Sequence, residues 1–166
     1  MTSETAKSIV VRALTFAGTF TLSLMIISGL PSVRSRRQRI LAQAAMDGNL
    51  RRVQLLHLTG AEVTARGYCC APLFLAAGQG RATVVRYLLD EGADVNAREK
   101  LGGTPLMEAA YSGYLEVIKE LLFRGAEINA IGTDGTALDI AISRDNAAAV
   151  ELLKHYGGKR ASEIRK

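Results

Sequence analysis

Residues 103–130 read GTPLMEAAYSGYLEVIKELLFRGAEINA, and they contain the signals of two short helices. Thr104 and Pro105 predict a helix start, because a threonine side chain caps free backbone N–H groups and proline fits the first helical position. The apolar residues that follow recur three and four positions apart until Gly113, which is expected to end the helix. We therefore predict a first short helix between Thr104 and Gly113.

The second half of this stretch predicts another helix and a turn. Apolar residues at helical spacing run from Leu115 to Phe123, and Gly125 is suited to the left-handed conformation that closes a helix. Residues 126–135 are rich in glycine, asparagine and aspartate, which favour tight backbone turns. The unit is therefore a helix pair followed by an extended turn.

The same unit recurs along the chain. Its copies begin at Leu41, Leu73, Leu106 and Leu138. The glycines that close the second helices recur every 32 or 33 residues, at Gly60, Gly92, Gly125 and Gly157. Such a period indicates stacked units that share one core, because no single unit can bury its own apolar face. We predict an all-α solenoid of about four helix-turn-helix units.

These units resemble ankyrin repeats over residues 38 to about 159. The Thr-Pro-Leu start, the alanine pair, the turn glycine and the Gly-Ala-Asp/Glu-x-Asn-Ala ending recur in register. The chain departs from the family pattern at the usual histidine (Phe74, Met107, Asp139), the capping threonine (Ala71), the proline (Ala137) and the turn glycine (Asp145). The resemblance implies a platform that binds another protein and catalyses nothing.

An uncharged apolar segment precedes the repeats. Its sequence, at residues 13–30, is ALTFAGTFTLSLMIISGL, which as a helix would reach about 27 Å, close to the thickness of bilayer hydrocarbon. We expect a single transmembrane helix there that ends at Pro31. The expected organisation is a polar segment (1–12), the anchor (13–30), a basic tether (31–38), the ankyrin-repeat domain (39–159) and a C-terminal tail (160–166).

The formal net charge of +5 lies before the repeats. Six basic residues and one acidic residue precede Ile40, and the remainder holds 15 of each, so the repeat domain does not predict nucleic-acid binding. A basic cluster follows the apolar segment, at Arg34, Arg36, Arg37 and Arg39. Because positive charge stays on the cytoplasmic side, this cluster predicts a single-pass protein with a cytoplasmic C-terminal domain near anionic lipid headgroups.

The apolar segment leaves two functions open. A retained anchor makes it a membrane-tethered scaffold or an accessory subunit of a larger membrane complex. A cleaved signal peptide would instead make it a periplasmic or secreted protein that protects or inhibits a partner, although Ile27 and Gly29 form a poor cleavage pair. A buried helix of a soluble fold is disfavoured, because no polar face interrupts the segment.

The resemblance implies that the partner meets the turn tips and the exposed ends of the first helices. Tyrosine and arginine are frequent anchors at interfaces. The candidate partner-binding residues are Tyr68, Arg81, Arg98, Lys100, Leu101, Tyr111 and Tyr114. The alternative is that such a tyrosine covers the neighbouring repeat and that such an arginine is solvated.

No pattern predicts catalytic residues, a cofactor or a metal. His57 and His155 lie at the ends of second helices, where a cation complements the helix dipole. The segment at Gly78 matches no phosphate-binding loop. Cys69 and Cys70 are adjacent and are expected to be reduced and structural, with a thiol-dependent redox module, a metal-scavenging pair or an intermolecular disulfide as alternatives.

Overall fold

The computed structural model describes residues 31–64 and 71–164, with the backbone alone at residues 31–35. The predicted anchor at residues 13–30 and the candidates Tyr68, Cys69 and Cys70 lie outside the described residues. Within the described ranges, no helix is both long enough and apolar enough to cross a membrane. The chain divides between Arg37 and Gln38 into two units, and the second contains every helix from α3 onward.

The second unit, which begins within α2, is a series of helix pairs, as predicted. The pairs are α2 (Pro31–Asp47) with α3 (Leu50–Leu58), α4 (Pro72–Gly78) with α5 (Ala82–Asp90), α6 (Pro105–Ser112) with α7 (Leu115–Phe123), and α8 (Ala137–Ser143) with α9 (Ala147–His155). A short helix, α10 (Ala161–Ile164), follows them. The described residues contain no strand, although one isolated β-bridge joins Gly132 and Gly135.

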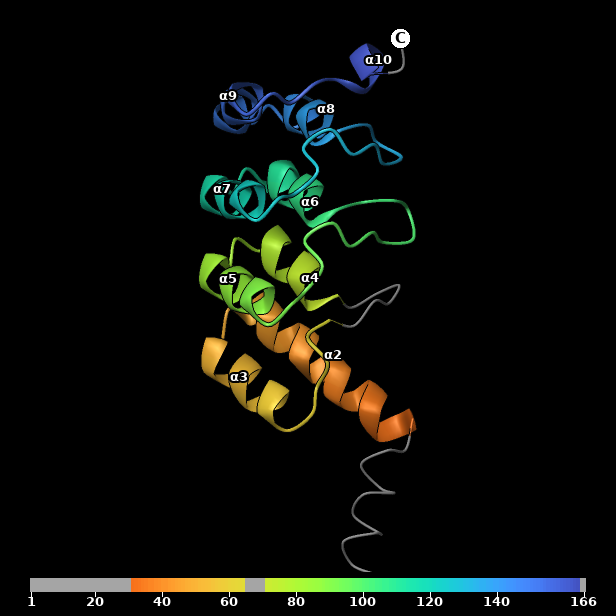
Figure 1. The fold of residues 1–166 in the computed structure, drawn as a ribbon, viewed down its shortest axis with the longest axis vertical. Helices are drawn as coiled ribbons and strands as arrows, with labels where there is room; N and C mark the ends of the chain where they lie inside the picture. Colours follow the sequence, from red (N-terminus) through yellow and green to blue (C-terminus); the bar gives the residue numbers. More distant parts are fainter. Residues whose placement is uncertain (1–30, 65–70, 165–166) are drawn as a thin grey trace, which may run out of the picture. The chain divides into compact units, whose positions relative to one another are not determined.

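Successive pairs stack helix on helix. The first helices contact one another in the order α4, α6 and α8, and the second helices do so in the order α3, α5, α7 and α9. Figure 1 shows the turns that follow α5 and α7 projecting on the side of the first helices. The stack therefore has a second-helix side and a turn side.

The third pair forms for the reasons that its sequence suggests. The Thr104 hydroxyl accepts a hydrogen bond from the Met107 N–H at 3.3 Å, and Gly113 ends α6 at a φ of 75°. Helix α7 spans Leu115–Phe123, which are the bounds predicted, and Gly125 follows at a φ of 85°. The predicted caps and ends of this pair are confirmed.

One apolar core runs through the stack. The predicted alanine pairs of the first helices are buried, at Ala44, Ala45, Ala76, Ala77, Ala109 and Ala110. Their small side chains allow the helices to approach closely, while Val53, Leu88, Leu121 and Leu153 fill the space beneath the second helices. The core is therefore shared between pairs, as a solenoid requires.

Two asparagines link each turn to the next repeat. The Asn96 side-chain oxygen accepts from the Glu127 N–H at 2.8 Å, and its amide donates to the Gly125 carbonyl at 3.3 Å. Asn129 repeats this pattern one unit later, with the Lys159 N–H at 2.7 Å and the Gly157 carbonyl at 3.4 Å. These bonds hold the turns in register.

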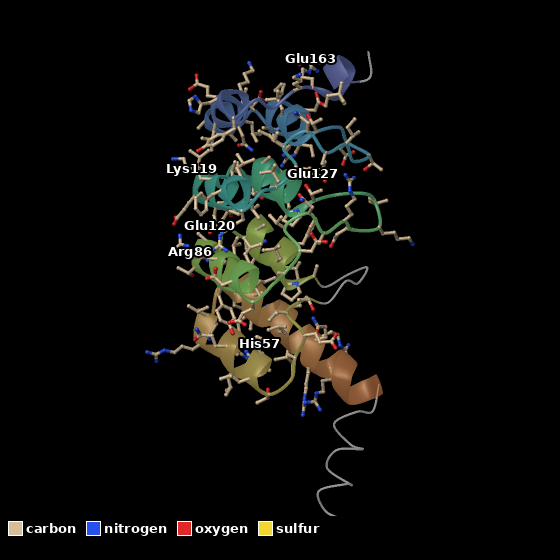
Figure 2. All side chains as sticks on the ribbon, viewed as in Figure 1. His57, Arg86, Lys119, Glu120, Glu127 and Glu163 are labelled. Atoms are coloured by element: carbon tan, nitrogen blue, oxygen red, sulfur yellow. The ribbon has the colours of Figure 1, made fainter. Side chains whose placement is uncertain are left out.

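Arginine–carboxylate pairs join the second helices. Arg86 Nε lies 3.3 Å from Glu120 Oε2, and Arg124 Nε lies 3.0 Å from Glu120 Oε1. Arg124 also pairs with Asp90. Figure 2 shows Arg86 and Glu120 together on the second-helix side of the stack. The acidic residue Glu120 is thus neutralised by two neighbours.

The basic segment predicted as a tether is helical. Helix α2 begins at Pro31, so residues 31–38 are its first residues. Proline fits there because the first helical positions have no intrahelical partner for an N–H group. Arg36 and Arg39 are exposed, whereas Arg37 is half-buried and has a polar or electrostatic contact; the side chain of Arg34 lies outside the described atoms.

Candidate binding groove

A cavity of about 470 Å³ lies between the turns and the first helices of the last three repeats. Its lining is of two kinds. The apolar and aromatic side chains are Phe74, Leu101, Met107, Tyr111 and Ile140, and the acidic ones are Glu99, Glu108 and Asp134. We call this cavity the groove.

Two turns form one wall of the groove. The turn of the second repeat closes through the Gly102 N–H, which donates to the Glu99 carbonyl at 2.9 Å. The following turn approaches it, because the Thr133 N–H lies 3.4 Å from the Leu101 carbonyl. A Cβ at Gly132 would lie 3.3 Å from the Gly102 carbonyl oxygen, so glycine permits this close approach of the two turns. The turns thus hold Leu101 beside α6 with 70% of its surface exposed.

The acidic wall centres on Glu108 of α6. Its side chain lies over Gly78 of α4, where an added Cβ would come 2.7 Å from Glu108 Cγ. Burial raises the pKa of the Glu108 carboxyl, and the nearby Glu99 raises it further. Burial also raises the pKa of Glu99. Among the described side chains, none forms an ion pair with Glu99, Glu108 or Asp134.

A second cavity of about 320 Å³ adjoins the groove. Phe74 and Glu99 line both cavities, and Asn96 and Arg98 contribute to the second. The hollow surface therefore continues along the turn side toward the second repeat. In the described ranges, no group of three or more histidine, cysteine or acidic residues is arranged to hold a metal ion.

Residues 41–132 match the ankyrin-repeat family, described as ankyrin repeats in three copies. The chain belongs to the ankyrin-repeat family. It is also similar to cortactin-binding protein 2 of Rattus norvegicus, with 37% identity over 90 residues that cover 51% of this chain and 5% of that protein. The chain thus matches only a small part of this relative's length. Its ankyrin repeats are a protein–protein interaction module, and the family typically has no enzymatic activity.

Three of the candidate partner-binding residues lie along this hollow side of the ankyrin stack. Leu101 and Tyr111 line the groove, and Arg98 lines the adjoining cavity. Arg98 also donates to the Ile131 carbonyl at 3.0 Å and lies 3.6 Å from a Glu127 oxygen. Lys100 is exposed beside Leu101 but lines neither cavity.

Two other candidates pack between ankyrin repeats. The Arg81 Nε donates to the Met46 carbonyl of the preceding repeat at 2.9 Å. The Tyr114 ring covers Gly80, where an added Cβ would lie 2.6 Å from its Cδ1 atom. Neither residue lines the groove, and Tyr114 follows the alternative stated above, in which a tyrosine covers the neighbouring repeat.

The acidic residues of the groove were missed by sequence reasoning. Glu108 occupies the repeat position at which the neighbouring ankyrin repeats have Leu75 and Ile140. A carboxylate at an otherwise apolar position was the sequence signal that could have identified it as a site residue. Phe74 and Met107 were noted only as departures from the family histidine. Glu99 and Asp134 carry no local signal, because acidic residues are common in exposed turns.

Proposed function

We propose that this chain is a membrane-tethered ankyrin module that holds a partner protein in the groove, as a scaffold or an accessory subunit of a membrane complex. The groove supports this choice of binding site, because the exposed Leu101 and the half-exposed Tyr111 line a cavity of about 470 Å³. Exposed aromatic and aliphatic side chains around a hollow favour a protein interface.

Sequence and charge support the membrane part of the proposal. The apolar residues 13–30 lead directly into the basic start of α2, where Arg36 and Arg39 are exposed. Each such arginine adds about 1 kcal/mol of attraction to an anionic membrane surface. The repeat module would then work close to the bilayer.

Site-specific photo-crosslinking in the native membrane tests the binding site. A photoreactive residue at Leu101 is expected to give a discrete partner adduct. The matched control is Lys119, which is exposed and points away from α7 on the second-helix side (Figure 2). Adducts at Lys119 but not at Leu101 would place the interface on the other side of the stack and refute the groove.

The mature N-terminus tests the tether. Mass spectrometry of the purified protein is expected to recover residues 13–30, and protease added to intact cells should leave the repeat domain uncut. Loss of the first ~30 residues would instead support the exported protein with a cleaved signal.

A further inference from the structure

We propose that the groove accepts a lysine or arginine side chain of the partner, carried on a peptide segment with an apolar residue beside it. This inference rests on the proposed function, because it assumes that the partner occupies the groove. It names the chemistry that the partner must present there.

Unpaired negative charge is the first observation. Glu99, Glu108 and Asp134 line the groove, and no described side chain forms an ion pair with any of them. Glu120, on the second-helix side, differs because two arginines neutralise it. Asp90, Glu127 and Asp139 outside the groove also lie beside an arginine. The three carboxylates of the groove have no such partner among the described side chains.

Two arginines near the groove have partners outside its lining. Arg98 binds the Ile131 carbonyl and lies near Glu127. The Arg144 guanidinium stacks over the Tyr111 ring at 4.1 Å from its centroid. No described basic side chain lines the groove, and Lys100, which is exposed beside Leu101, lines neither cavity. An incoming cation would therefore meet three acidic groups in a lining that holds no basic side chain.

Partial burial strengthens the attraction. Glu108 is half-buried against Gly78, and both burial and Glu99 raise its pKa, which means that its charged form is poorly solvated. A positive charge placed beside such a carboxylate interacts more strongly than it would in open water. A bound lysine or arginine would replace the water that Glu108 has lost.

The apolar lining selects the kind of cation. Phe74, Met107 and Ile140 offer aliphatic and aromatic surface next to the carboxylates. A lysine or arginine has an apolar stem that can cover such surface while its head reaches the acids. A bare metal ion does not fit, because the acids of the groove do not converge as a metal-ligand group in the described structure.

Binding of peptide pools to the full-length chain tests this inference. The pools share leucine on both sides of a central position, which is fixed as arginine, lysine, leucine or glutamate, and are otherwise degenerate. We expect the arginine and lysine pools to bind about tenfold more tightly than the glutamate pool, with affinity falling as salt is added. Equal binding of the glutamate pool, or no binding of any pool, would overturn the inference.

Charge-removing variants locate the effect. Glu108→Gln combined with Glu99→Gln should weaken binding of the arginine pool about tenfold. Thermal unfolding should not occur at a lower temperature, because glutamine keeps the side-chain shape and removes a poorly solvated charge. Glu116→Gln, on the exposed face of α7, is the matched control and should bind as the unmodified chain does. Unchanged binding by the double variant refutes the inference.

Leu101→Ser separates this inference from the proposed function. If Leu101→Ser weakens binding of every pool and the pools do not discriminate by charge, the groove remains the interface and the inference fails. If the arginine pool binds and neither Leu101→Ser nor the glutamine variants affect it, binding lies elsewhere and the groove is refuted for both.

Discussion

At the residue scale, the turn between the two helices of a repeat explains why Asp145 can replace the glycine that the other repeats have there. Gly80 and Gly113 have positive φ, and an added Cβ would meet Tyr114 and Asn146 of the following repeat at 2.6 and 3.0 Å. Asp145 has the same left-handed conformation, with a φ of 54°. Among the described residues, no further ankyrin repeat follows it, so its side chain meets no such neighbour.

Asp145→Gly is therefore expected to stabilise the protein. It relieves the left-handed conformation of a residue with a Cβ and loses no packing, which should add about 0.5–1 kcal/mol to the free energy of unfolding. Gly113→Ala should do the reverse, because it adds both the conformational cost and a contact with Asn146. Thermal unfolding measures both variants, and a lower Tm for Asp145→Gly would contradict the explanation.

Asp139 acts at the same scale. Its oxygens accept hydrogen bonds from the Ala161 N–H at 2.8 Å, the Arg160 guanidinium at 2.9 Å and the Thr136 N–H at 3.1 Å. Desolvation raises the pKa of this carboxyl, but the hydrogen bonds outweigh it and lower the pKa from 3.8 to about 2. The residue that replaces the family histidine thus binds the C-terminal segment.

This shift predicts a loss of stability in acid. Since the folded-state pKa is lower than the unfolded one, the stabilisation is fully present above about pH 4 and is lost as the pH falls toward 2. With allowance for solvent screening, it amounts to about 1–2 kcal/mol. Urea unfolding of the native chain and of Asp139→Asn should differ near pH 6 and converge near pH 2. A constant difference would refute the assignment.

At the element scale, the caps and the asparagine bonds set the helix ends and the register of the turns. The ends of α6 and α7 were predictable from Thr104, Gly113 and Gly125, because capping depends on residues adjacent in sequence. The early start of α2 was not, since a proline is compatible both with ending one helix and with beginning another. The bonds of Asn129 to the next repeat also required the structure.

Asn129→Ala should destabilise the fold by about 1–3 kcal/mol, because the Lys159 N–H and the Gly157 carbonyl lose their side-chain partner. Asn129→Asp keeps the acceptor and removes the donor, so its effect should be intermediate. The midpoint of urea unfolding measures both. An alanine variant as stable as the native chain would show that water replaces these bonds.

At the scale of the whole repeat domain, stability should depend on contacts between neighbouring repeats. The C-terminal segment closes the fourth repeat, where the Lys159 carbonyl accepts from the buried Thr136 hydroxyl at 2.8 Å and Arg160 pairs with Asp139. Because each repeat of a solenoid contacts only its neighbours, a local loss should weaken one end of the stack before the other.

Removal of residues 159–166 tests whether a loss at one end of the stack weakens only the neighbouring repeat. Hydrogen exchange should become faster in α8 and α9, which lose bonds at Thr136, Asp139 and Asn129, while α4 and α5 should keep their protection. Uniformly faster exchange throughout the domain would indicate a single cooperative unit instead.

The sequence by itself determined the helix pairs and their stacking, because the repeat of apolar residues, caps and glycines acts locally and recurs in every unit. The tertiary structure decided which surface is hollow and what lines it. In the structure, Arg81 and Tyr114 contact the preceding repeat. Glu99, Glu108 and Asp134 come from separate segments and line one groove. These acidic residues are distant in sequence and become neighbours only when the repeats stack. No local sequence pattern could therefore predict the negative charge of the groove.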